Sequence, residues 1–480
     1  MKDGFGFENY TNMGVTNMTA DELRRMFGDQ VCGSMMGGCT LTPPAQQWMD
    51  EANKAMDGGH CFGFSHLALQ LYRGTLRPAD FGGASTSALA KDGNDKLQRE
   101  LAYWMATQFV KPSAERFVTD LAPNDVLGKL RQAFSAGMGG EQYTLGIFKM
   151  EMGKRTGGHA VTPYAIADGN PVRLMVYDNN FPNQERSLEI DSGANSWKYT
   201  ATINPSEPAG LYQGDATTKT LMLAPVSSAQ GQQACPFCGN MMMTMMSDRQ
   251  VIPNGAARVS VTDDQGRMVS DTANQIPGAE TAPMMSADLF SHHEPLFRLP
   301  GGSDLTIAID GSDMQASTQE SVSVLGQGYT LAVEGVTLAP GQTDTLRVTK
   351  AGDQIRYRTS SMETPVVVLG VQSAGPDYAF GIRVSGDADG QEAVLRIDLQ
   401  SGQLAVEIKD NANTTYGITI RRIDDGGVSE FTHAGATVGG NDTVYLDYAA
   451  WGGQGQPLTI EVDQGSDGTI DQTLLLSDDN

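Results

Sequence analysis

Apolar residues recur every three to four positions in several segments of the first 137 residues. This spacing is typical of helices that bury one face. The pattern predicts helices near 20–28, over 45–56, from Cys61 onward, and twice within 92–137. The N-terminal part of the chain is therefore expected to be mainly helical.

The apolar spacing then changes to short alternating runs, which are typical of strands. Strands are expected at 143–150, 159–168 and 172–179, in a hairpin over 187–203, and at 218–226. Helices that precede antiparallel strands are the pattern of an α+β domain, which we place at residues 1–226.

Residues 227–250 form a Cys/Met-rich linker in this interpretation. Beyond it the sequence consists of short strands separated by Gly, Asp and Asn. This pattern predicts all-β structure, with a small β domain at 251–312 and an acidic, immunoglobulin-like β-sandwich domain at 313–480. No sharp internal repeat is visible.

Composition and charge restrict the class of protein. Hydrophobic residues make up 40% of the 480 residues and charged residues 19%, which indicates a globular protein of two to four domains. The net charge is −24, and 301–480 alone holds 26 acidic and 9 basic residues. This excess argues against nucleic acid as a partner, because phosphate binding needs clustered Lys and Arg. No apolar run is long enough for a transmembrane helix, and no signal-peptide pattern opens the chain.

The spacing of the five cysteines suggests different roles for the paired and the single ones: Cys32, Cys39, Cys61, Cys235 and Cys238. Two close pairs would form two disulfides, or together a four-thiolate zinc site. The remaining one, Cys61, is a candidate nucleophile. Disulfides favour an extracellular, periplasmic or cell-surface location.

Other metal sites are conceivable, although no cofactor is required. Carboxylates alternate with glycine in 387–392 and 463–471, and such oxygen-rich loops suit structural calcium. Ordinary acidic turns explain both loops equally well. The methionines of 241–246 suit Cu(I) or flexible packing.

The candidate chemistry lies around Cys61. Gly58 and Gly59 precede it, and a helix that begins at the thiol favours the reactive thiolate. His159 opens a predicted strand and Asp178 follows the next one. Cysteine, imidazole and carboxylate are the parts of a Cys-His-Asp triad, in which the base activates the thiol and the acid orients the base.

These segments resemble the papain-like cysteine peptidases. GGHCFGFS is similar to their cysteine segment, GGHAVTPYAI to their histidine strand, and VYDNNFPN lies where the family has its third residue. The resemblance covers roughly 20–225. It implies that Cys61 is the nucleophile, His159 the general base and acid, and Asp178 the orienting residue, with Asn179 as the alternative third member.

The family's oxyanion-hole glutamine has no clean match just before Cys61. Asn53 or Gln47 is the tentative side-chain donor, and the backbone N–H of Cys61 would be the other. One such donor contributes about 3 kcal/mol to catalysis.

The expected function is a cysteine-dependent hydrolase that cleaves a protein or peptide substrate through a thioester. A transglutaminase-like acyltransferase, a non-catalytic cell-surface or binding protein that keeps the fold, and a disulfide oxidoreductase that uses Cys235 and Cys238 remain as alternatives. The β domains would bind a cell-surface ligand or act as spacers.

Overall fold

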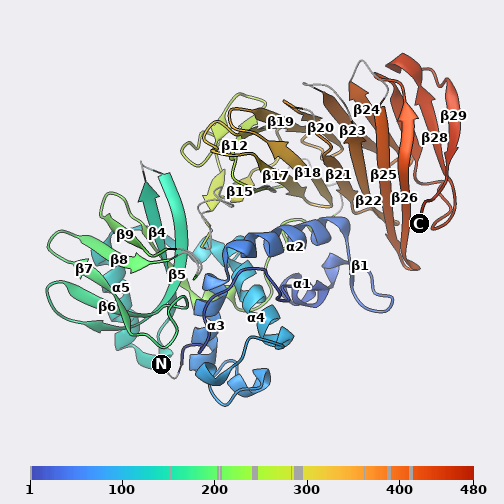
Figure 1. Cartoon of the computed structure of the whole chain (residues 1–480). Coiled ribbons are helices and arrows are strands. Elements are labelled where there is room, and N and C mark those ends of the chain that lie inside the picture. The colour runs from blue at the N-terminus through green and yellow to red at the C-terminus, as the bar shows by residue number, and fades with distance from the viewer. Residues whose placement is uncertain are drawn as a thin grey trace. The chain divides into compact units, whose positions relative to one another are not determined.

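The computed structural model describes residues 3–151, 154–202, 205, 208–239, 247–282, 284–285, 296–361, 363–385, 391–409 and 414–480 (Figure 1). Strands account for 41% of the chain and helices for 20%, so the protein is mainly β. The chain divides into two compact units. Unit 1 comprises residues 1–28, 49–235 and 283–293, and unit 2 comprises residues 29–48, 236–282 and 294–480.

Unit 1 contains the helices that the apolar spacing predicts. The α-helices of the described chain are α1 (Ala20–Phe27), α2 (Pro43–Ala55), α3 (Cys61–Arg73), α4 (Asp95–Ala106) and α5 (Pro123–Ser135). The boundary between the units falls within α2. At the start of α1 the Glu22 carboxylate accepts the Thr19 N–H at 2.9 Å and the Thr19 hydroxyl at 2.6 Å, and Asn94 caps α4 by accepting the Leu97 N–H. Polar caps at these two starts explain where the helices begin.

The sheet of unit 1 is antiparallel and has eight strands among the described residues. Its order is β3 (Val118–Leu121), β10 (Leu221–Pro225), β4 (Tyr143–Glu151), β5 (Lys154–Ala167), β6 (Val172–Tyr177), β7 (Arg186–Asp191), β8 (Ser196–Ala201) and β9 (Gly210–Asp215). Strand β9 also lies next to β4, so the sheet curls back on itself. The strands from β4 to β8 and β10 match the predicted ones, whereas β3 and β9 were not predicted.

Helix α3 packs against both α4 and β5, and Figure 1 shows α3 and α4 side by side. A Cβ on Gly63 of α3 would lie 2.1 Å from the carbonyl oxygen of Leu101 in α4. Only glycine permits this approach of the two helix backbones. The close contact fixes the start of α3 relative to α4.

Unit 2 contains two large antiparallel sheets. Among the described residues, one sheet has nine strands in the order β14 (Glu280–Ala282), β15 (Leu296–Leu299), β11 (Arg249–Asn254), β17 (Thr318–Gly326), β18 (Tyr329–Leu338), β21 (Val366–Val371), β22 (Asp377–Ser385), β25 (Thr414–Asp424) and β26 (Gly427–Val438). The other has ten: β13 (Met268–Val269), β12 (Arg258–Asp263), β16 (Leu305–Asp310), β19 (Thr343–Val348), β20 (Gln354–Arg358), β23 (Glu392–Asp398), β24 (Gln403–Lys409), β27 (Thr443–Asp447), β28 (Leu458–Asp463) and β29 (Gln472–Leu476). The strands β1 (Cys32–Ser34) and β2 (Thr40–Leu41) form a separate small sheet.

From β17 onward, successive β-hairpins lie alternately in the nine-stranded sheet and in the ten-stranded sheet. Two consecutive strands pair in the nine-stranded sheet, the next two pair in the ten-stranded sheet, and the cycle repeats through β28. The topology therefore repeats every four strands, although the sequence shows no sharp repeat.

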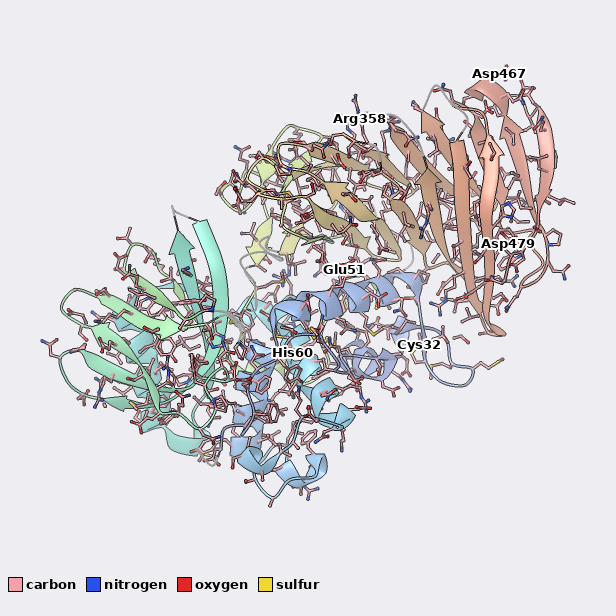
Figure 2. All side chains as sticks on the ribbon, viewed as in Figure 1. Cys32, Glu51, His60, Arg358, Asp467 and Asp479 are labelled. Carbon is pink, nitrogen blue, oxygen red and sulfur yellow. A yellow bond between two sulfur atoms is a disulfide. The ribbon has the colours of Figure 1, made fainter. Side chains whose placement is uncertain are left out.

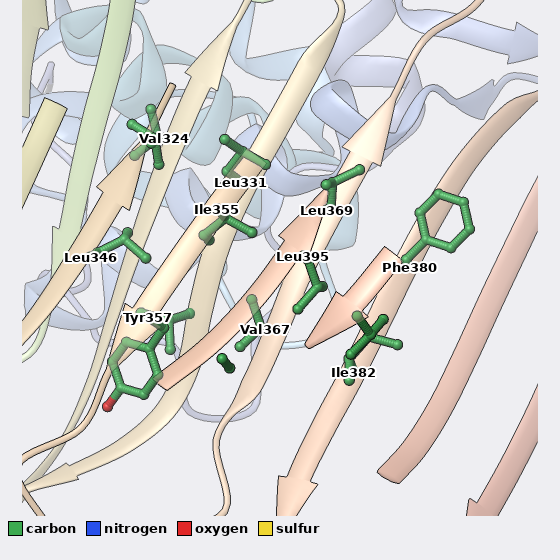
Figure 3. Close-up of a cluster of buried hydrophobic side chains, with 14 of the residues drawn as sticks. Val324, Leu331, Leu346, Ile355, Tyr357, Val367, Leu369, Phe380, Ile382 and Leu395 are labelled. Carbon is green, nitrogen blue, oxygen red and sulfur yellow. The ribbon is translucent and has the colours of Figure 1, made fainter. Parts of the chain in front are cut away.

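One hydrophobic core joins the two sheets of unit 2. Figure 3 shows Val367 and Leu369 of β21 near Ile355 of β20 and Leu395 of β23. All four side chains are fully buried. Burial of one side of each strand explains the alternating apolar pattern. The expected β-sandwich is confirmed.

The division into units differs from the predicted domains. Strand β11, which precedes residue 312, pairs with β17, which follows it, and β16 pairs with β19. The segments 251–312 and 313–480 thus share both sheets rather than forming two domains. Together the two sheets contain nineteen described strands, nine in one and ten in the other, whereas the two sheets of an immunoglobulin domain contain seven to nine in total.

The paired cysteines form disulfides. Cys32, labelled in Figure 2, is bonded to Cys39, and Cys235 and Cys238 are also disulfide-bonded. The alternative of a four-thiolate zinc site is therefore wrong, because zinc binds thiolates. The redox alternative at Cys235 and Cys238 stays a prediction.

Among the described residues, no helix has the length and apolarity to cross a membrane.

Candidate active site

Cys61 is the first residue of α3 and the one free cysteine of the chain. The short helix before it ends at Gly58, and Gly59 has a φ of 123°. A Cβ on Gly59 would also lie 2.8 Å from Nδ2 of Asn9. Backbone conformation and space both require glycine here. The turn lets a new helix begin at Cys61, so that the positive end of the α3 dipole faces the thiol.

His159 lies on β5 and is fully buried. Its Nε2 is 2.8 Å from Oδ1 of Asp178. Asp178 directly follows β6, the strand next to β5, which brings the two side chains together. The carboxylate holds Nε2 as the protonated ring nitrogen and leaves Nδ1 for another partner.

Asp178 is buried and held as a carboxylate by three donors. Oδ1 accepts hydrogen bonds from His159 and from the Asn180 N–H at 2.9 Å, and Oδ2 accepts one from the Tyr199 hydroxyl at 2.6 Å. Burial alone would raise the pKa of Asp178. The charge and hydrogen bond of His159, together with the other donors, outweigh it and lower that pKa.

The surroundings of His159 favour the imidazolium, which is the form that results when the ring takes the proton of Cys61. Burial opposes the charge, but the charge of Asp178, the hydrogen bond to it and the interaction with Cys61 raise the pKa of His159 to about 10. Nδ1 has no hydrogen-bond partner of ordinary geometry among the described atoms. Cys61 is close enough to His159 to raise the pKa of the ring, as expected for a thiol and its base.

Asn179 does not contact His159 in the way expected of a third triad member. Its Nδ2 donates to the carbonyl oxygens of Cys61 at 3.1 Å and Ala160 at 2.9 Å. The side chain therefore ties the start of α3 to β5, and Asp178 rather than Asn179 contacts His159.

The two tentative oxyanion donors have other partners. Asn53 exchanges hydrogen bonds with the backbone of Met18, at 3.0 and 3.1 Å. Gln47 belongs to unit 2 and donates to Ser323 and Glu334. Both amides are engaged with these partners, and the expectation that one of them binds an oxyanion stays a prediction.

Gln108 is a candidate that the sequence did not reveal. It lies on the short helix Thr107–Phe109 after α4 and is buried. Its Nε2 donates to the carbonyl oxygen of Met285 at 3.4 Å, and its Oε1 accepts the Met285 N–H at 2.9 Å. The Cys61 thiol donates to the same Met285 oxygen at 3.6 Å. Nε2 of Gln108 also donates to the carbonyl oxygen of Met105 at 3.2 Å, so the amide donor beside the thiol is shared between two carbonyl oxygens.

Met285 belongs to unit 1 and covers the thiol. Cys61, His159 and Asp178 all have zero exposed surface, and Met285 is equally buried. A carbonyl oxygen of the chain itself therefore lies beside the Cys61 sulfur.

His60, labelled in Figure 2, is not a second base. Its Nδ1 contacts the Tyr10 carbonyl oxygen and its Nε2 the Asn17 Oδ1, both at 2.8 Å. Burial lowers the pKa of His60 to about 4 despite the hydrogen bond with Tyr10. The ring is neutral and fixes the loop before α3.

A cavity of about 510 Å³ lies elsewhere in unit 1. Tyr72, Phe134, Met138, Tyr164 and Tyr177 are among its lining residues, and none of the three triad candidates lines it.

The expected metal sites find no support in the described part of the chain. No three His, Cys, Asp or Glu side chains come together there as a metal site. Asp463 accepts the backbone N–H groups of Asp467 and Gly468, as in an ordinary acidic turn, and Asp467 is exposed (Figure 2). The methionine run 241–246 and most of 387–392 lie outside the described residues.

Comparisons with models of protein families, with curated proteins and with solved structures find no match for this chain.

Proposed function

We propose that unit 1 is a papain-like cysteine hydrolase that cleaves peptide bonds. The observation that carries this proposal is the meeting of Cys61, His159 and Asp178 in one buried site. The three residues come from a helix start, a strand, and the end of the neighbouring strand. His159 is hydrogen-bonded to Asp178, and its interaction with Cys61 is one of the causes that raise the pKa of His159.

In the proposed reaction, the His159 imidazole takes the Cys61 proton, and the thiolate attacks the carbonyl carbon of a peptide. The C–S bond forms while the carbonyl electrons move to oxygen. The imidazolium then gives its proton to the leaving amine as the C–N bond breaks. Water, deprotonated by His159, attacks the thioester and releases the acid and the thiol. Asp178 stabilises the imidazolium throughout.

Two donors support the oxyanion in this scheme. One is the Cys61 backbone N–H at the start of α3, and the other is Nε2 of Gln108, which already binds a peptide carbonyl beside the thiol. Removing one such donor lowers kcat by about 10²–10³. Gln108 therefore replaces Asn53 and Gln47 in the proposal.

The two disulfides support an oxidising location, outside the cytoplasm. In this setting the acidic β-sandwich of unit 2 would bind a cell-surface ligand or position the hydrolase.

The test is hydrolysis of a fluorogenic peptide library. Because Met285 covers the thiol, the assay uses both the wild type and Met285→Glu, with Cys61→Ser and His159→Gln made in each. We expect hydrolysis in at least one background and a loss of at least about 10³-fold in the triad variants. His433→Gln, which changes a partly exposed imidazole of unit 2, is the matched control and should leave the rate unchanged.

The outcome separates the function classes. Incorporation of an added amine instead of release of the free acid identifies an acyltransferase. Absence of any Cys61-dependent turnover in both backgrounds, with the fold intact, rejects the enzyme and leaves a non-catalytic binding protein.

A further inference from the structure

A stretch of the chain's own backbone lies at the candidate nucleophile. Met284 and Met285 follow β14 in sequence and belong to unit 1. The carbonyl oxygen of Met285 is 3.6 Å from the Cys61 sulfur and 3.4 Å from Nε2 of Gln108. Gln108 also accepts the Met285 N–H at 2.9 Å, so its side-chain amide hydrogen-bonds both backbone polar groups of Met285. Two-sided recognition of backbone N–H and C=O is how sites hold an extended peptide.

Two glycines leave room for this stretch on the strands below it. A Cβ on Gly146 of β4 would lie 2.7 Å from the Met285 sulfur, and a Cβ on Gly158 of β5 would lie 2.7 Å from the Met284 carbonyl oxygen. Strands β4 and β5 are paired neighbours. A larger residue at Gly158 would push the Met284 backbone away from the sheet, and one at Gly146 would displace the Met285 thioether.

The side chain of Met285 lies in an apolar subsite. Its sulfur is placed over the bare backbone of Gly146, where the Met222 methyl group also ends, 3.3 Å from the same Cβ position. Met285 and Met222 are both buried. The glycine backbone and the Met222 methyl group leave room for a long unbranched side chain that bends at a thioether.

We propose that Met284–Met285 is bound as an internal peptide ligand in the substrate site, and that this site selects peptides with methionine or a similar unbranched apolar residue at the Met285 position. The proposal rests on the proposed function, because it treats Cys61 as the nucleophile. The internal ligand and a substrate need the same atoms of Gln108 and the same space over Gly146. The stretch therefore competes with substrate, and the enzyme is inactive while Met284–Met285 occupies the site.

The experiment measures covalent labelling of Cys61 in the full-length protein by mass spectrometry. Iodoacetamide reports access to the thiol without any peptide recognition. Peptidyl chloromethyl ketones that end in methionine, valine or glutamate report the subsite, since the thiolate displaces chloride and forms a thioether. Met285→Glu removes the internal ligand by placing a charge against an apolar floor, and Met285→Ala does so by removing the anchoring side chain. Met138→Glu makes the same change at a methionine that is 53% exposed, and serves as the control.

We expect iodoacetamide to label Cys61 at least tenfold faster in Met285→Glu and Met285→Ala than in the wild type or Met138→Glu. In the faster variants the methionine reagent should react at least tenfold faster than the valine and glutamate reagents. Adding Gly146→Ala should remove this preference while leaving the iodoacetamide rate high.

Equal iodoacetamide rates in the wild type and both Met285 variants would overturn the internal ligand, even if peptides are hydrolysed. Equal rates for the three peptidyl reagents would overturn the subsite. Failure of the proposed function is distinguishable, because Cys61 would then be labelled as expected while no peptide is cleaved in a Cys61-dependent way.

Discussion

Replacing Asp178 by asparagine tests the electrostatics at the centre of the candidate site. The substitution keeps the shape of the side chain and an oxygen for the His159 and Asn180 donors, but it removes the charge that faces the imidazolium. A shift in the pKa of an imidazole from 6.5 to about 10 corresponds to roughly 5 kcal/mol. Breaking a buried ion pair costs about 3–5 kcal/mol. We therefore expect Asp178→Asn to lower the free energy of unfolding of unit 1 by about 4 kcal/mol near pH 6.

The dependence on pH follows from the two pKa shifts. The pKa of His159 is raised, so its contribution is complete below about 6.5 and is lost as the pH rises through about 10. The pKa of Asp178 is lowered, so its contribution is present above the ordinary carboxyl value of 3.8 and is lost as the pH falls below it. The difference between wild type and Asp178→Asn should be greatest between about pH 4 and 6.5 and should shrink toward pH 10.

The assay uses the Cys61 thiol as a reporter of unfolding. Cys61 is free and buried while the other four cysteines are disulfide-bonded, so trapping of its thiol in increasing urea reports the opening of unit 1 alone. The labelling rate of the fully unfolded protein at each pH corrects for ionisation of the thiol. NMR of the His159 ring checks the pKa directly and should show it below 6.5 in the variant, because burial then acts without the Asp178 charge.

The control is Asp168→Asn, which removes an exposed ion pair with Arg131 and should cost at most about 1 kcal/mol. A loss in Asp178→Asn that does not change between pH 6 and 10 would refute the reasoning. So would a wild-type His159 that titrates near 6.5.

Three further predictions use the same readouts. Tyr199→Phe leaves Oδ2 of Asp178 without its hydroxyl donor, and should cost about 1–3 kcal/mol in Cys61 trapping; no change would mean that solvent replaces the donor. Leu369→Ala empties part of the unit 2 core and should cost about 2–5 kcal/mol in the calorimetric unfolding of that unit, and an equal effect on Cys61 trapping would show that the units do not unfold separately. Replacing Cys32 and Cys39 together by serine opens a disulfide across seven residues and should cost about 2 kcal/mol in the same calorimetric transition, while an unchanged transition would contradict the prediction.

Much of the local structure followed from periodicity alone. The start of α3 at Cys61 could be predicted because a glycine pair and an apolar helical face meet there. The proximity of His159 to Asp178 followed because one lies on a strand and the other ends its antiparallel neighbour. These are short-range signals, in which residue type and element boundary coincide.

The remaining features of the site depend on contacts between distant segments. Gln108 ends a helix and has no local pattern that marks a site, and Met285 lies 224 residues beyond Cys61 in sequence. Asn53 was expected near the thiol because it is close in sequence, but its amide is used to hold Met18. In unit 2, alternation predicted strands correctly but carries no information about which sheet each strand joins, because both sheets bury one face in the same core.

The hairpin alternation in unit 2 has a consequence for how the sandwich can change in length. Each cycle of four strands adds two strands to each sheet and keeps every pairing antiparallel. Duplication or loss of one cycle would preserve the spacing of the sheets and their core, while moving the C-terminal end by a fixed step. The number of cycles therefore sets the length of the sandwich.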